Sequence, residues 1–141
     1  MVENQRKVYV VMVADLFHYG HVELLKRARE YGNYLVVGLV SDESAAENKR
    51  TPILSMEERK RVLEACRYVD EVRVQEENVT NEWLKENGFA VKVHAVFDET
   101  AQALHRMWNT EMGDQYKVEV PYEYGISTSE IIERIKNRDD L

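Results

Sequence analysis

The chain has few of the residues that mark disulfide-stapled, membrane-spanning or nucleic-acid-binding proteins. Its single cysteine, Cys66, allows no intramolecular disulfide, and a lone thiol is typical of a reducing compartment. The apolar run 8–14 ends at Asp15, and no stretch approaches the roughly 20 apolar residues that cross a bilayer. A formal net charge of −7 argues against nucleic-acid binding. We therefore expect a cytoplasmic protein without nucleic-acid or membrane partners.

The apolar residues occur in an order typical of an α/β fold. Hydrophobic residues make up 44% of the 141, enough for one domain over 1–141, with a frayed tail at about 137–141. Strand-length apolar runs alternate with segments of helical period, which predicts a Rossmann-like, doubly wound, mainly parallel five-stranded sheet with helices on both faces. The predicted strands are Lys7–Ala14, Tyr34–Val40, Glu71–Val74, Val91–Phe97 and Tyr116–Val120. The predicted helices are His21–Tyr31, Ser55–Cys66, Thr80–Asn87, Thr100–Asn109 and Ser127–Asn137.

Helix boundaries are indicated by capping residues. Gly32 is predicted to be the C-cap of the first helix, and Ser55 with Glu58 forms a capping box for the second. Thr80 is the predicted N-cap of the third helix, which Gly88 ends. Since ligands of open parallel sheets bind at the carboxyl ends of the strands, the loops after the strands are the informative ones.

The first such loop, Asp15–His21, has the features of an anion site. His18 and His21 lie on one side of a helix start, beside unpaired backbone N–H groups and the positive end of the helix dipole. Gly20 between them allows a phosphate to approach the backbone. Two other interpretations remain open: His18 caps the helix and His21 is an ordinary residue, or the pair binds a metal, for which familiar ligand spacing is lacking.

The loop Asp15-Leu16-Phe17-His18-Tyr19-Gly20-His21 resembles the H-x-G-H signature of the nucleotidyltransferase superfamily. It is most similar to the group that contains the glycerol-3-phosphate, phosphocholine and phosphoethanolamine cytidylyltransferases. Ordered matches at 26–38, 41–43, 67–72 and 125–129 extend the resemblance over about residues 8–135.

The resemblance implies an enzyme that transfers a nucleotidyl group, expected to be cytidylyl, from a nucleoside triphosphate to a phosphomonoester, releasing pyrophosphate. It also implies Mg²⁺ with the triphosphate and an active homodimer. The catalytic residues that it implies are His18, His21 and Lys49. The implied nucleotide- or phosphate-binding residues are Asp15, Leu16, Phe17, Gly20, Arg50, Arg67, Asp98, Gly125, Ile126, Ser127 and Thr128.

Some of these positions have competing structural explanations. Lys49, or Arg50 by strict spacing, would close over the phosphates from a mobile basic loop, although a solvated basic loop has the same composition. Arg67 could contact the triphosphate, complement a helix dipole or pair with Asp70. Ser127 or Thr128 is expected to be the N-cap of the last helix whatever else it binds.

The sequence departs from its relatives at two places. Tyr122 stands where they have a phosphate-binding arginine. Three explanations stay open: Arg106 or Lys117 substitutes for it, the acceptor differs from the usual one, or catalysis is weakened. Where relatives have His-Gly-Asp-Asp, an ungapped alignment places residues 94–97, in the last part of the fourth predicted strand. No carboxylate is then available to accept from a cytosine amino group before Asp98. Two alternatives therefore stay open: an adenylyltransferase of the same superfamily that uses ATP, and a non-catalytic nucleotide-binding module.

Overall fold

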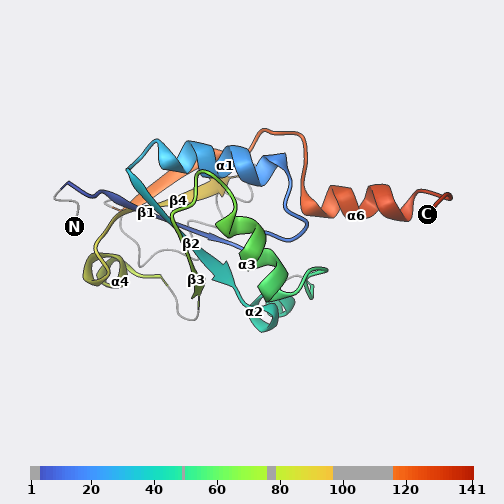
Figure 1. Cartoon of the computed structure of the whole chain (residues 1–141), viewed down its shortest axis with the longest axis horizontal. Coiled ribbons are helices and arrows are strands. Elements are labelled where there is room, and N and C mark those ends of the chain that lie inside the picture. The colour runs from blue at the N-terminus through green and yellow to red at the C-terminus, as the bar shows by residue number, and fades with distance from the viewer. Residues whose placement is uncertain (1–3, 49, 76–78, 97–115) are drawn as a thin grey trace.

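The computed structural model of the chain, which describes residues 4–48, 50–75, 79–96 and 116–141, is a layered α/β structure (Figure 1). The strands are β1 (Lys7–Met12), β2 (Tyr34–Val40), β3 (Glu71–Gln75), β4 (Phe89–Val96) and β5 (Lys117–Pro121). The helices are α1 (Tyr19–Arg29), α2 (Asp42–Asn48), α3 (Met56–Glu64), α4 (Asn81–Glu86) and α6 (Thr128–Lys136).

All five strands are parallel, in the order β3-β2-β1-β4-β5. Strand order reverses between β1 and β4, because the chain moves outward in one direction through β2 and β3 and then returns to add β4 and β5 on the other side. The carboxyl ends of β1 and β4 therefore flank the topological switch point, where open α/β sheets bind their ligands.

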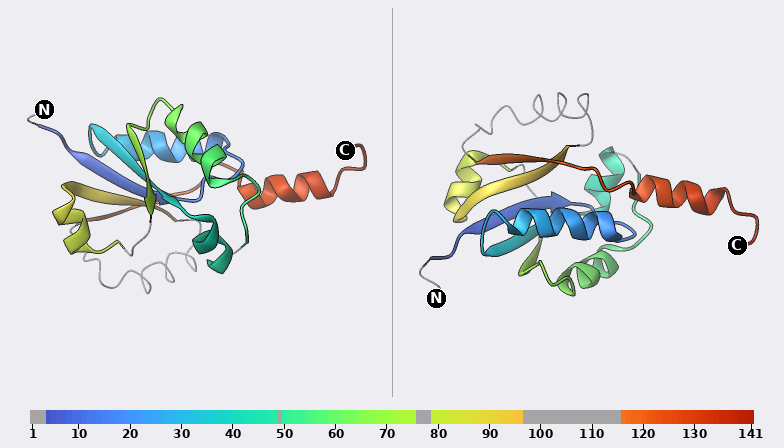
Figure 2. Two further views of the ribbon diagram at one scale, coloured as in Figure 1. Left: turned by 60° about the horizontal axis from the view of Figure 1, so that its bottom comes forward. Right: turned by 90° about the horizontal axis from the view of Figure 1, so that it is seen from above.

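Each face of the sheet carries its own core. On one face α1 and α3 contribute Leu25 and Leu63 to a cluster with buried residues of β1, β2, β4 and β5. On the other face Leu84 of α4 packs with Tyr9 and Phe89. Figure 2 shows the sheet between α1 and α3 on one side and α4 on the other. The doubly wound arrangement that the sequence predicts is confirmed.

The five predicted strands are all present, with boundaries that differ by at most two residues. The sequence analysis missed α2, although Ser41 begins it by accepting a hydrogen bond from the Ser44 N–H (3.2 Å). The predicted helix Thr100–Asn109 lies outside the described residues. Gly32 is not the C-cap of α1, which is Glu30.

Close packing explains Gly32 instead. A Cβ at this position would lie 2.4 Å from the Arg6 carbonyl oxygen and 2.6 Å from Val8 Cγ2. The capping box of Ser55 and Glu58 and the Thr80 N-cap are confirmed.

The last helix, α6, extends away from the body of the molecule and contributes to it mainly through its N-terminal turn (Figure 1). Within 128–136, all of which the structure describes, no residue is buried. In the part of the chain that the structure describes, no helix is both long enough and apolar enough to cross a membrane.

Candidate active site

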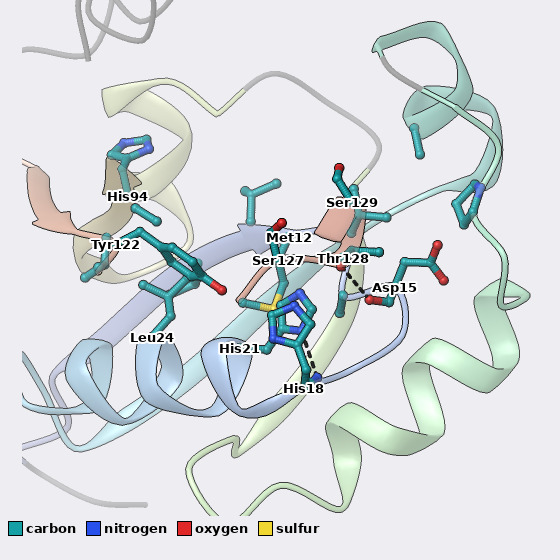
Figure 3. A pocket seen from close by; sticks show the side chains of 18 of the residues that line it. Met12, Asp15, His18, His21, Leu24, His94, Tyr122, Ser127, Thr128 and Ser129 are labelled. Atoms are coloured by element: carbon teal, nitrogen blue, oxygen red, sulfur yellow. Dashed lines mark hydrogen bonds between the residues drawn. The ribbon is translucent and has the colours of Figure 1, made fainter. Parts of the chain in front are cut away.

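A cavity of about 600 Å³ opens at the carboxyl ends of β1 and β4, at the switch point of the sheet (Figure 3). It is bordered by β1 and the loop after it, the start of α1, the end of β4, and the turn that begins α6. The lining residues are Val10, Val11, Met12, Val13, Ala14, Asp15, His18, His21, Leu24, Ala45, Arg50, Pro52, Val93, His94, Ala95, Tyr122, Ser127, Thr128 and Ser129.

His18 and His21 form the capping box of α1. His18 is the N-cap, and its Nδ1 accepts a hydrogen bond from the Gly20 N–H (3.1 Å). His21 Nδ1 in turn accepts from the His18 N–H (3.1 Å). The two rings lie with centroids 3.9 Å apart, and Phe17 stacks on the His21 ring from the loop side. The capping role that the sequence offers for His18 is therefore confirmed, and the anion site at the same two residues stays a prediction.

This capping geometry fixes the tautomer of both histidines. Because each Nδ1 accepts a hydrogen bond, the proton of each neutral ring is on Nε2. Burial lowers the pKa of His18, and burial followed by the charge of His18 lowers the pKa of His21 to about 4, against an opposing effect of Asp15. Both rings are thus neutral near pH 7 and present Nε2–H donors beside the positive end of α1.

Asp15 joins the loop that follows β1, residues 13–18 (the histidine loop), to residues 50–55 (the basic loop). Its carboxylate accepts from the N–H groups of Ile53 (2.8 Å) and Leu54 (2.9 Å). Ala14 and Leu16 on either side have left-handed φ values of 56° and 49°. Asp15 lines the cavity, but both of its carboxylate oxygens bind the basic loop. The C-terminal part of that loop is therefore anchored to the histidine loop.

The basic loop supplies one cation to the cavity. Arg50 is the only lysine or arginine among the described lining residues, and its Nη1 donates to Ser129 Oγ (3.3 Å). Arg59 of α3, by contrast, is fully buried and does not line the cavity. Its spacing from Met56 and Leu63 puts it on the apolar stripe of α3, and this signal could have distinguished it from its exposed neighbours.

The N-terminal turn of α6 borders the cavity next to the basic loop, where Arg50 contacts Ser129. Ser127 is the N-cap, and its Oγ accepts from the backbone N–H three residues later (3.1 Å). Thr128 Oγ1 donates to the Asp15 carbonyl oxygen (2.8 Å), as the dashed line in Figure 3 shows. The predicted N-cap of the last helix is therefore confirmed, and it is Ser127. Thr128 contacts the histidine loop, and Ser129, which was not among the predicted site residues, also lines the cavity.

Tyr122 occupies the space next to the glycine of the histidine signature. Its hydroxyl donates to the Ile126 carbonyl oxygen (2.7 Å), and a Cβ built on Gly20 would lie only 2.0 Å from that hydroxyl. Its ring packs edge-on against Tyr124 with centroids 4.9 Å apart. The space that glycine leaves at position 20 is therefore filled by the Tyr122 hydroxyl, and the approach of a phosphate to this backbone stays a prediction.

Other expected site residues lie away from the cavity lining. Four of them, Leu16, Phe17, Gly125 and Ile126, shape the two loops without lining it. Arg67 is exposed after α3 and also does not line it. The alternative pairing of Arg67 with Asp70 is wrong, because Asp70 pairs with Arg29 (2.5 Å).

Of the two cations that could replace the family arginine, Lys117 is nearly buried on β5, pairs with Glu119 (3.3 Å) and does not line the cavity. Arg106, Lys49 and Asp98 lie outside the described residues. His94, 6% exposed, lines the cavity at the end of β4, where relatives have the first residue of His-Gly-Asp-Asp.

The profile of the Cytidylyltransferase-like family matches residues 13–134. A probable ethanolamine-phosphate cytidylyltransferase of Encephalitozoon cuniculi is 37% identical over 139 residues, which are 94% of this chain and 42% of that protein. A glycerol-3-phosphate cytidylyltransferase of Staphylococcus aureus is 35% identical over 140 residues, 95% of this chain and 98% of the relative. A lipopolysaccharide core biosynthesis protein from Thermoplasma volcanium shares the fold, with a TM-score of 0.67 at 22% identity over 85% of this chain and 98% of that one.

The coverage differs between the two kinds of relative. The chain spans 42% and 33% of two ethanolamine-phosphate cytidylyltransferases that it matches, and 98% and 97% of two glycerol-3-phosphate enzymes. The match extends from the end of β1 into α6 and so includes the three loops around the cavity. The chain therefore belongs to the cytidylyltransferase-like family.

Proposed function

We propose that the chain catalyses transfer of a cytidylyl group from CTP to a phosphorylated small molecule. The observation that carries the proposal is the pair of adjoining neutral histidines at the start of α1, whose Nε2–H donors border a cavity large enough for a nucleotide. Two relatives, named as an ethanolamine-phosphate and a glycerol-3-phosphate cytidylyltransferase, support the same chemistry.

The reaction needs positioning and charge stabilisation more than proton transfer. A phosphate oxygen of the acceptor forms a bond to the α-phosphorus of CTP, and the bond from that phosphorus to the bridging oxygen of pyrophosphate breaks. Since the attacking phosphate is already anionic, no general base is required. His18 and His21 would donate to the oxygens on which charge develops, and Arg50 with the first turn of α6 would hold the remaining phosphates.

Mg²⁺ belongs to this proposal as a companion of the triphosphate. Among the described residues no group of three His, Cys, Asp or Glu side chains could hold a metal ion, so the protein offers no preformed site there and we derive no step through the metal. Its presence is tested by the dependence of turnover on added Mg²⁺ and by the effect of a chelator.

The substrates are tested by a screen for pyrophosphate release, with CTP and ATP each combined with glycerol 3-phosphate, ethanolamine phosphate, choline phosphate and a sugar phosphate. We expect release with CTP and at least one acceptor. Faster release with ATP would replace cytidylyl by adenylyl transfer. Calorimetric binding of a triphosphate without any release would identify a nucleotide-binding module instead.

We also propose a cytoplasmic homodimer, supported by the single cysteine and by the prevalence of twofold symmetry among oligomers. Light scattering at working concentration should give twice the 16.6 kDa of the chain. A particle of 16.6 kDa would contradict the dimer.

A further inference from the structure

Arg59 of α3 is a buried cation that the proposed chemistry does not use. It has 0% exposure and heads the fully buried side chains of the described residues in volume. Its Nε donates to the Leu54 carbonyl (3.2 Å), its Nη1 to the carbonyls of Val13 (2.8 Å) and Val40 (2.9 Å), and its Nη2 to the Asp42 carboxylate. An unpaired guanidinium would be costly here, so each of these contacts supports the buried charge.

These contacts join the segments that border one side of the cavity. Val13 follows β1, Val40 ends β2, Asp42 begins α2 and Leu54 belongs to the basic loop. The planar fork of an arginine can serve several carbonyl oxygens in fixed directions, whereas the ammonium of a lysine concentrates its donors at one point. The arrangement is therefore specific to arginine.

Arg59 and Asp15 hold the same residue of the basic loop from its two sides. The N–H of Leu54 donates to Asp15 Oδ1 (2.9 Å), and its carbonyl accepts from Arg59. Because Arg59 also binds the Val13 carbonyl, a closed ring of contacts runs from Val13 through Asp15 and Leu54 to Arg59 and back. Inside the ring lies Ala14, whose left-handed φ of 56° is unfavourable for an L-residue.

We propose that Arg59 is a positioning residue for nucleotidyl transfer. This role rests on the proposed function. Arg59 holds the histidine loop against the basic loop and does not touch substrate. The strained turn at Ala14 is retained because the ring holds it, and that turn directs the chain toward His18. Loss of the fork should move the histidines relative to Arg50, while the Tyr122 side of the cavity keeps its own contacts.

The test compares Arg59→Lys with Arg61→Lys, a matched change on the same helix at a side chain that is 77% exposed. Steady-state kinetics use the triphosphate and acceptor that give the highest turnover with the unchanged protein. For Arg59→Lys we expect kcat/KM for the triphosphate to fall at least tenfold, with KM for the acceptor within about twofold. Arg61→Lys should match the unchanged protein.

Turnover by the unchanged protein tests the proposed function separately from the role of Arg59. If it binds a triphosphate without turnover, the same two variants are compared by calorimetric Kd, with the same tenfold expectation. A folded Arg59→Lys protein with unchanged kinetics or affinity would overturn the positioning role. The role would also be overturned if kcat/KM fell equally for triphosphate and acceptor, in proportion to the folded fraction measured by circular dichroism.

A second variant keeps the inference testable if Arg59→Lys folds poorly. Ala14→Gly removes the cost of the left-handed φ, because glycine adopts it freely. In the Arg59→Lys background it should restore cooperative unfolding and at least threefold of the lost kcat/KM. A double variant no better than Arg59→Lys alone would show that the ring does not act by holding this turn.

Discussion

Gly20→Ala should destabilise the protein, and Tyr122→Phe should relieve most of that destabilisation. The added Cβ would lie 2.0 Å from the Tyr122 hydroxyl oxygen and 2.9 Å from His18 Cε1. The hydroxyl cannot retreat freely, because it donates to the Ile126 carbonyl (2.7 Å). The clash with oxygen is therefore the more severe of the two, and it is absent when residue 122 is phenylalanine.

The expected magnitude follows from three opposing effects. Overpacking of this kind costs about 1–3 kcal/mol, and alanine returns roughly 0.5–1 kcal/mol over glycine in a helix. Tyr122→Phe alone loses one hydrogen bond of about 1 kcal/mol. In the phenylalanine background the remaining close contact is with the His18 ring, so Gly20→Ala should cost at least about 1 kcal/mol less there than in the unchanged protein.

Urea unfolding of the four proteins measures this coupling free energy, provided that the m-values agree. The control cycle combines Gly20→Ala with Tyr34→Phe, which removes a hydroxyl that donates to Glu71 far from the site. That control should be additive. Additivity within about 0.5 kcal/mol in the Tyr122 cycle as well would refute the packing of Tyr122 on Gly20.

The histidines and Tyr122 give further predictions. His18→Ala and His21→Ala should each lower turnover about a hundredfold or more and, because each breaks the capping box, lower the free energy of unfolding by about 1 kcal/mol; near-normal rates in both would remove the proposed mechanism. The depressed pKa of His21, about 4, means that the unfolded chain takes up this proton first as pH falls. Stability should therefore decline between about pH 6.5 and 4 by up to roughly 3 kcal/mol, and His21→Gln should flatten that part of a urea-midpoint profile, whereas an unchanged profile would contradict the buried neutral ring. Tyr122→Arg should lower kcat/KM or leave it unchanged, since the substitution gives up the bond to Ile126 O; a tenfold gain with glycerol phosphate would show that the lost arginine limits activity.

Periodicity and capping residues were sufficient to predict the framework. The strand Tyr34–Val40 was predicted to the residue because its apolar run has no polar interruption, and five of its residues are buried. Ser55 and Thr80 are recognisable as caps because side chain and backbone donor lie within three residues. The capping role of His18 was predictable for the same reason, since a capping box is a local structure.

Missed features depend on contacts between distant segments. Ser41 begins α2, but a helix of seven residues is too short to be distinguished from a loop by its sequence pattern alone. Arg67 carries a charge suited to phosphate, yet the turn after α3 leaves it exposed and away from the cavity.

The sequence by itself determined the elements, the sheet type and the position of the histidine pair, because each follows from spacings within a few turns of chain. Only the tertiary structure decided which polar groups serve the site and which hold it together. Asp15 is predicted to bind the nucleotide, yet its carboxylate binds the backbone of Leu54, and Arg59 binds the carbonyls of Leu54 and Val13. Local spacing does not reveal these partners. The hydrogen bond from Arg59 to Val13 joins residues 46 positions apart, so it exists only once the sheet has brought those loops to one edge.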